Sequence, residues 1–77
     1  MNLSKYDQCF KEVFGVKEEM MNEEFRFGEG KWNSFAHMEL IAKLEDTFDI
    51  FLYTEDITHF ENYENGKKIL AKHGINI

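Results

Sequence analysis

Ser34 is the residue of this chain whose surroundings point to chemistry. A serine hydroxyl is a weak nucleophile unless a neighbouring base activates it, and the nearby candidates are His37, Glu39 and Glu45. His37 lies about one helical turn after Ser34, but neither acid is adjacent to the serine. Nothing in the chain resembles a catalytic triad with an oxyanion hole. We therefore expect that Ser34 has no catalytic role of its own and that a partner enzyme acts on its hydroxyl.

The stretch from Trp32 to Phe48 must position this hydroxyl, and its pattern predicts one amphipathic helix. Asn33 is a favourable N-cap residue, and neither glycine nor proline interrupts the run. At about 100° per residue, the apolar side chains fall on two separate arcs. The inner arc holds His37, Leu40, Ile41, Leu44 and Phe48. The outer arc holds Phe35, Met38 and Ala42.

The outer arc needs an explanation, because a surface helix requires only one apolar stripe, which faces the core. Three acids, Glu39, Glu45 and Asp46, surround the outer arc. An apolar patch ringed by carboxylates predicts a docking surface next to a modifiable hydroxyl. On the inner side, we interpret His37 as a hydrogen-bonded core histidine and Trp32 as a core aromatic.

The residues around Ser34 resemble those of the acyl carrier proteins, in which an Asp-Ser-Leu motif opens the second helix. Here the motif is Asn33-Ser34-Phe35, within a longer match to the pattern W-D-S-L-A-H-x-x-L of small stand-alone carriers. The match includes Trp32, Ala36–Leu40, Leu44–Glu45, Phe48–Ile50 and Asp56–Ile57. The resemblance covers nearly the whole chain.

The resemblance implies that Ser34 carries a 4′-phosphopantetheine arm, which a phosphopantetheinyl transferase would take from coenzyme A. The thiol of the arm would hold acyl or aminoacyl groups as thioesters for loading and acyl-transferring enzymes. A phosphate suits a helix N-terminus, where free N–H groups and the positive end of the dipole lie. The residues implied to bind partners are Asn33, Phe35, Met38, Glu39, Ala42, Glu45 and Asp46. The chain itself would not be an enzyme.

Two residues depart from the family motif. Asn33 replaces the aspartate and keeps the capping function, but it lacks a charge that a basic transferase would read. Phe35 replaces a leucine and is bulkier, so both changes indicate dedicated partners. An alternative hypothesis is an unmodified acidic adaptor that binds partner proteins through residues 34–48. A small enzyme is a third hypothesis, which the lack of a convergent acid–base pair disfavours.

Length and composition restrict the possible classes further. A chain of 77 residues predicts a single domain, 1–77, with a small core. The lone Cys9 cannot form an internal disulfide, and no Cys/His spacing suggests zinc, so packing of the eight phenylalanines must supply stability. The net charge of −6 argues against nucleic-acid binding. No apolar stretch approaches the roughly 20 residues of a membrane span. We expect a monomeric, cytoplasmic protein.

The residue pattern of the whole chain predicts an all-α fold. The resemblance implies a small four-helix bundle of acyl-carrier type, with three longer helices and one short helix. The expected helices are Leu3–Phe14, Ser34–Phe48 within the stretch from Trp32, Glu55–His59 and Tyr63–His73. The expected N-caps are Asn2 or Ser4 for the first helix, Asn33 for the second, Thr54 for the third and Asn62 for the last. Gly15 and Gly74 follow the first and last helices as stop signals.

The connections carry three further expectations. The long segment Val16–Lys31 is predicted to hold one short helical turn at 17–21, and several apolar side chains should pin it to the core. These side chains are Val16, Met20, Met21, Phe25 and Phe27. The apolar run Asp49–Tyr53 has strand propensity but no partner strand, so an extended crossover is expected. Gly66 costs about 1 kcal/mol relative to alanine within a helix, which predicts a close helix crossing there.

Overall fold

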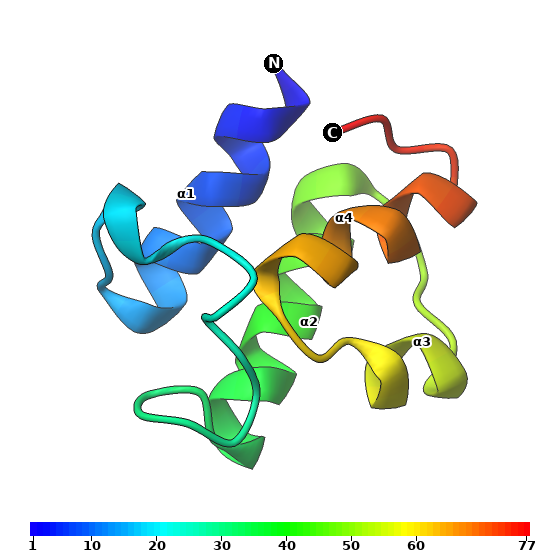
Figure 1. Ribbon diagram of the computed structural model, residues 1–77. Coiled ribbons are helices and arrows are strands. Elements are labelled where there is room, and N and C mark those ends of the chain that lie inside the picture. The colour runs from blue at the N-terminus through cyan, green and yellow to red at the C-terminus, as the bar shows by residue number, and fades with distance from the viewer.

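The computed structural model describes residues 1–77 and contains four α-helices and no strand (Figure 1). The helices are α1 (Asn2–Phe14), α2 (Ser34–Phe48), α3 (Thr54–His59) and α4 (Tyr63–Lys72). One 3₁₀ turn, η1 (Glu18–Met20), lies between α1 and α2. The predicted all-α class, with three longer helices and one short helix, is therefore confirmed.

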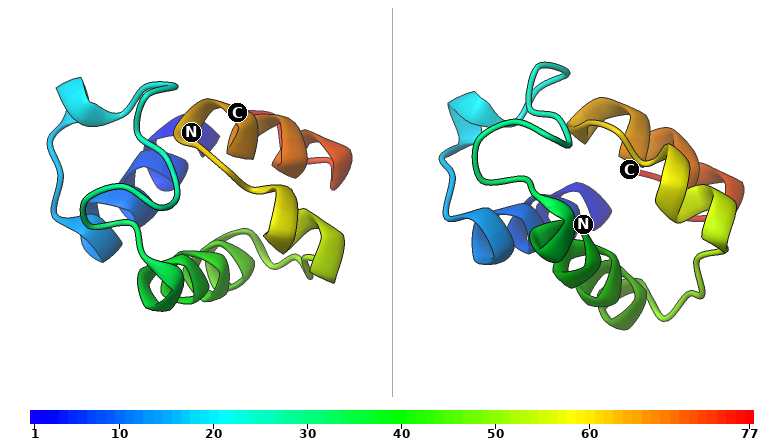
Figure 2. Two further views of the ribbon diagram at one scale, coloured as in Figure 1. Left: turned by 60° about the horizontal axis from the view of Figure 1, so that its bottom comes forward. Right: turned by 90° about the horizontal axis from the view of Figure 1, so that it is seen from below.

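The helices pack around a shared interior, with η1 and α3 on opposite sides of the molecule (Figures 1 and 2). The two chain ends lie close together, and the side-chain amide of Asn2 donates a hydrogen bond to the carbonyl oxygen of Asn76 at 2.9 Å. This bond holds the C-terminal segment against the start of α1.

The helix ends follow the sequence signals in some places and not in others. The predicted caps of α1 are wrong, because Asn2 and Ser4 both lie inside the helix, and Met1 occupies the cap position without a side-chain bond. The hydroxyl of Ser4 donates instead to the carbonyl oxygen of Met1. Gly15 ends α1 as predicted, with a positive φ of 65° and an N–H that donates to the Lys11 carbonyl.

The predicted cap of α3 is also wrong by one residue. Thr54 is the first residue of the helix, and Tyr53 precedes it as the cap residue. The carboxylate of Asp56 accepts a hydrogen bond from the backbone N–H of Tyr53, so an acid in the first turn closes this helix start. Asn62 caps α4 as predicted, because its side-chain oxygen accepts the N–H of Asn65.

The core is a single cluster of buried apolar side chains in which aromatic rings predominate. Phe10 lies at its centre, with its ring centroid 4.9 Å from that of Tyr6, 5.2 Å from that of Tyr63 and 5.5 Å from that of Trp32. Since Trp32 is fully buried, its interpretation as a core aromatic is confirmed. These contacts join α1 and α4 to the segment that leads into α2.

The connection between α1 and α2 is pinned to the core by only part of the predicted set. Met21 and Phe25 are buried, and Val16 packs partly against the core, whereas Met20 and Phe27 remain exposed. Backbone hydrogen bonds from Phe27 to Glu61 and from Tyr63 to Phe25 hold the connection against the start of α4. The predicted turn at 17–21 is confirmed as η1.

Gly66 lies where α4 crosses the core, as predicted. A Cβ atom on this residue would overlap the ring of Phe60 and the hydroxyl group of Tyr6. The backbone of α4 therefore approaches these two side chains more closely than any other residue type would allow.

The crossover from α2 to α3 forms no strand, as predicted, and its side chains alternate between inside and outside. Leu52 is buried, whereas the neighbouring Phe51 and Tyr53 are exposed. The crossover begins with Asp49 in the left-handed region, at a φ of 53°, where its N–H donates to the Glu45 carbonyl and ends α2. This conformation is one that aspartate tolerates better than most residues do.

Cys9 is buried in the contact between α1 and α2. Its thiol donates a hydrogen bond to the hydroxyl of Thr47 at 3.4 Å, and only 2% of the residue is exposed. Burial raises the pKa of the Cys9 thiol above its ordinary value, although the bond to Thr47 partly opposes this effect. Cys9 is therefore a packing residue and not a reactive thiol.

Candidate functional site

The candidate site begins at the N-terminus of α2. Asn33 has an extended backbone, with φ of −98°, and its side-chain oxygen accepts the N–H of Ala36 at 2.9 Å. The predicted N-cap is thus confirmed, and the capping bond is made by Asn33 and not by Ser34. Ser34 is the first residue of the helix and is exposed to solvent. Its hydroxyl is left accessible at the positive end of a 15-residue helix.

The outer arc of α2 is exposed as the sequence pattern predicts. Phe35, directly after Ser34, is 77% exposed, and Met38 one turn later is 52% exposed. Ala42 continues this apolar stripe along the solvent side of the helix. Two large apolar side chains on one outer helix face form a surface that no part of this chain covers.

The acids around this stripe differ in their own contacts. Glu39 and Asp46 are exposed and form no ion pair within the chain. Between them, Lys43 pairs with Glu12 of α1 at 2.6 Å, and this hydrogen bond raises the pKa of Lys43 and lowers that of Glu12. Lys43 is thus engaged by Glu12, and neither Glu39 nor Asp46 forms an ion pair of its own.

Glu45 has a different position from the other two acids. It is half-buried, and its Oε2 atom accepts the backbone N–H of Leu52 at 2.9 Å. Since one carboxylate oxygen already holds the crossover after α2, Glu45 is also a structural residue. The sequence did not reveal this second role, because the two residues are separated by the turn at Asp49.

His37 is buried, and both ring nitrogens have partners. The indole N–H of Trp32 donates to Nδ1 of His37 at 2.9 Å, and Nε2 of the histidine lies 2.8 Å from the carbonyl oxygen of Ile57. Because Nδ1 accepts and the carbonyl can only accept, Nε2 must carry the proton. His37 is therefore a hydrogen-bonded core histidine, as predicted, and it has no free nitrogen to activate Ser34.

Phe27 lies near the site, although the sequence analysis did not include it among the site residues. Its ring lies edge-on against His37, with centroids 4.8 Å apart and an interplanar angle of 65°. Phe27 is 42% exposed, so it brings an accessible aromatic ring close to His37, which lies one turn after Ser34. The spacing of the apolar residues in the long connection gave no signal for this contact.

The site offers an accessible hydroxyl but contains no base that is hydrogen-bonded to it. Ser34 has an accessible hydroxyl, and the one nearby imidazole is used by Trp32 and Ile57. No group of three or more His, Cys, Asp or Glu side chains is arranged to hold a metal ion. A shallow hollow beside the outer arc, between α1 and α2, is lined by Glu12, Val13, Glu39, Ala42, Lys43, Asp46 and Thr47.

None of the four helices is both long enough and apolar enough to cross a lipid bilayer. In comparisons with known proteins, no family model, no curated protein and no solved structure matches this chain.

Proposed function

We propose that this chain is a carrier protein of the acyl-carrier type, in which Ser34 is the attachment site of a 4′-phosphopantetheine arm. The observation that carries the proposal is the exposed Ser34 hydroxyl at the capped start of α2, beside the exposed Phe35 and Met38. The arm, taken from coenzyme A, would supply a thiol that holds acyl or aminoacyl groups as thioesters.

The residues at the start of α2 fit a phosphodiester. The first N–H groups of a helix have no partner within it, and they attract negative charge together with the helix dipole. Asn33 uses its side-chain oxygen for the Ala36 N–H and adds no negative charge that would repel a phosphate. Ser34 itself is exposed, so its oxygen is accessible to a transferase.

The chain would be the substrate of enzymes and not an enzyme. Both nitrogens of His37 have partners, so the imidazole is not available to take the Ser34 proton. A phosphopantetheinyl transferase would instead supply the base and the metal ion for the transfer. Ser34 would contribute its oxygen to the new P–O bond while a P–O bond of the coenzyme A pyrophosphate breaks. Adenosine 3′,5′-bisphosphate would leave, and the serine proton would pass to that enzyme.

The outer face of α2 would be the surface that partner enzymes contact. Phe35, Met38 and Ala42 offer apolar area, and Glu39 and Asp46 offer unpaired negative charge. Such charges speed encounter and select partners more than they add affinity, which suits a monomeric carrier that must leave each enzyme quickly. The expected partners are the transferase and the loading and acyl-transferring enzymes, each with a basic docking surface.

Intact-mass spectrometry tests the proposal. The protein is incubated with coenzyme A and a phosphopantetheinyl transferase of broad specificity, and the expected result is a gain of one phosphopantetheine arm. Ser34→Ala should abolish this gain, whereas Ser4→Ala, at the other serine of the chain, should leave it intact. No mass gain with several transferases would contradict the proposal.

The alternative function is that of an unmodified acidic adaptor, and Asn33 in place of the motif aspartate favours it. An adaptor would bind its partners equally well after Ser34→Ala. Its binding would weaken when Glu39 and Asp46 are changed to lysine. Asp46 and Glu39 suit this test better than Glu45, whose charge reversal would also release the Leu52 N–H.

A further inference from the structure

We propose that the cargo of this carrier stays outside the helical bundle and is therefore a short or polar acyl or aminoacyl group. This inference rests on the proposed function and names its substrate class. A chain of many methylene groups is costly to leave in water, so a carrier of long chains must offer it an interior. A short or polar group gains little from burial, and a carrier with a closed interior suits it.

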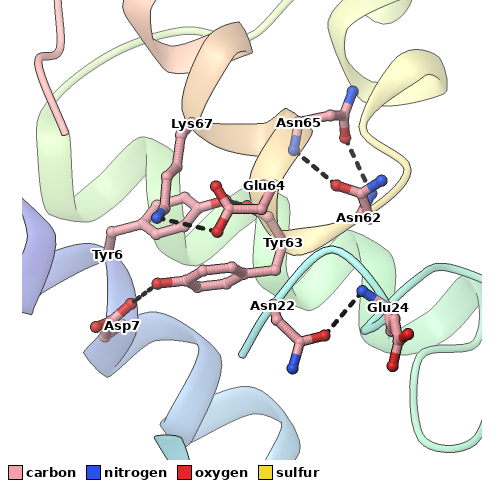
Figure 3. Close-up of polar contacts among 9 residues, drawn as sticks. All are labelled: Tyr6, Asp7, Asn22, Glu24, Asn62, Tyr63, Glu64, Asn65 and Lys67. Atoms are coloured by element: carbon pink, nitrogen blue, oxygen red, sulfur yellow. Dashed lines mark hydrogen bonds and ion pairs between the residues drawn. The ribbon is translucent and has the colours of Figure 1, made fainter. Parts of the chain in front are cut away.

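The interior between α1 and α4 is closed by aromatic rings whose polar ends are fixed. The hydroxyl of Tyr6 donates to the carbonyl oxygen of Tyr63 at 2.7 Å, and the hydroxyl of Tyr63 donates to the carboxylate of Asp7 (Figure 3). An acyl chain could enter here only by moving both rings. That movement would leave the buried Tyr6 hydroxyl unpaired, which is costly.

The crossing at Gly66 shows how little room remains inside the bundle. The space next to its α-carbon is filled by the ring of Phe60 and the hydroxyl group of Tyr6, so not even one additional carbon fits. Phe60 also lies 6.1 Å from Trp32 and 6.2 Å from His37, measured between ring centroids. Moving its ring would therefore disturb the core on the α2 side as well.

The seam between α2 and α3 is closed by His37. Nδ1 of the ring accepts the indole N–H of Trp32, and the Nε2 proton is donated to the carbonyl oxygen of Ile57 in α3. The ring of Phe27 packs against the imidazole, with the ring centroids 4.8 Å apart. His37 thus acts as a latch between α2 and α3.

A second set of bonds holds α3 from its other side. Asp56 of α3 is only 3% exposed, and its carboxylate lies 2.7 Å from Nε2 of His73 and 3.2 Å from Nζ of Lys72. Moving α3 aside to admit a chain would break these contacts of the buried Asp56 carboxylate together with the His37 bond. Losing the hydrogen bonds of a buried carboxylate is costly, which favours the closed form.

The test compares a short and a long cargo on the same position. Acetyl-coenzyme A and octanoyl-coenzyme A are used with the transferase to load Ser34, and the melting temperature and the backbone amide NMR spectrum of each product are recorded. The expected result is equal melting temperatures and no length-dependent shift at buried Leu44, Phe60 or Ile69. A melting temperature several degrees higher for the octanoyl form, with shifts at these amides, would overturn the proposal.

A chemical route keeps this test independent of any transferase. Ser34→Cys creates an exposed thiol that accepts a maleimide whose linker is about as long as the phosphopantetheine arm and ends in an acetyl or octanoyl amide. The wild-type chain is the control and should take up no label, because Cys9 is buried. If no transferase modifies Ser34, the proposed function fails, but this pair of conjugates still decides whether the interior admits a chain.

The latch is tested by His37→Ala in the Ser34→Cys background. Removing the imidazole breaks the bond to Ile57 between α2 and α3 and the bond from Trp32, so the octanoyl conjugate should now melt at a higher temperature than the acetyl conjugate. Met38→Ala, which truncates the exposed neighbour, should show no such difference. If the acetyl and octanoyl conjugates of a folded His37→Ala protein melt at the same temperature, the assignment of His37 as the latch is overturned. If His37→Ala does not fold, the comparison in the wild-type core remains decisive.

Discussion

The indole N–H of Trp32 donates a hydrogen bond to Nδ1 of His37 at 2.9 Å, and both side chains are buried. The bond fixes the tautomer of the histidine, since its other nitrogen must then carry the proton that is donated to Ile57. One imidazole therefore joins the segment before α2, α2 itself and α3. The same geometry explains why the histidine nearest to Ser34 in the sequence takes no part in chemistry at the serine.

Replacing Trp32 by phenylalanine tests the first of these bonds. Trp32→Phe keeps an aromatic ring but removes the donor, so Nδ1 of His37 is left without a partner in the core. An unsatisfied buried acceptor costs about 1–3 kcal/mol, and a decrease of that size is expected in the free energy of unfolding. Urea denaturation should be followed by circular dichroism, because Trp32 is the single tryptophan.

The control for this variant is Phe35→Leu, which changes an exposed aromatic side chain a short distance along the chain. Its free energy of unfolding should stay within about 0.5 kcal/mol of the wild-type value. A Trp32→Phe protein as stable as the control would show that the hydrogen bond contributes nothing to the free energy of unfolding.

The cap at Asn33 gives a second prediction. Asn33→Ala removes the oxygen that accepts the Ala36 N–H, so the free energy of unfolding should fall by about 1 kcal/mol. Asn33→Asp keeps an acceptor and places a negative charge at the helix N-terminus, which should preserve or slightly increase stability. The two variants are compared by urea denaturation, and equal losses in both would contradict the capping role.

The same two variants separate capping from recognition by a transferase. If a basic transferase reads a carboxylate at this position, Asn33→Asp should raise kcat/KM for transfer of phosphopantetheine to Ser34. Asn33→Ala should not raise kcat/KM, although it replaces the same residue, because alanine has no carboxylate. A rate with Asn33→Asp no higher than wild type would show that the asparagine is no obstacle to modification.

Gly66→Ala tests the crossing of α4 over the core. The substitution gains about 1 kcal/mol of helix propensity, but the new methyl group overlaps Phe60 and Tyr6. Overpacking of this kind costs about 1–3 kcal/mol, so the expected outcome is no gain or a net loss of stability. Lys68→Ala, on the exposed side of the same helix, is the matched control. A Gly66→Ala protein more stable than wild type would contradict the close crossing.

The sequence predicted those features that depend on local spacing. The two arcs of α2, the cap at Asn33 and the crossing at Gly66 all follow from helical periodicity and residue type, and the structure has all three. The start of α1 was not predictable in this way, because Asn2 and Ser4 have the side chains of caps but lie within the helix. Local propensity cannot decide between neighbouring cap positions.

The long-range polar contacts were not predictable from the sequence. Asp56 and His73 are 17 residues apart, and each has the side chain of an ordinary surface residue. Only the packing of α3 against the end of α4 brings them together and buries the carboxylate. The use of Glu45 to hold the Leu52 N–H likewise depends on the reversal of the chain at Asp49. Such pairs have no periodicity that a single sequence could reveal.

The buried carboxylate of Asp56 leads to a prediction about pH. Burial by itself raises the pKa of Asp56, but the hydrogen bonds from His73, the Tyr53 N–H and Lys72 together outweigh it and lower the pKa below its ordinary value. A carboxyl group whose pKa is lowered by folding stabilises the native state above its unfolded pKa of about 3.9. That contribution is lost as the pH falls through the lower, folded pKa.

Asp56→Asn should therefore be less stable than wild type at pH 7, by about 1–3 kcal/mol, because His73 and Lys72 lose their charged partner. The difference between the two proteins should shrink as the pH is lowered below about 4, since the Asp56 carboxyl of the unfolded wild-type chain takes up a proton there and that of the folded protein does so at its lower pKa. Urea denaturation at a series of pH values between 7 and 3 measures this difference directly. A stability difference that stays constant over the whole series would show that the Asp56 carboxylate does not act through its charge.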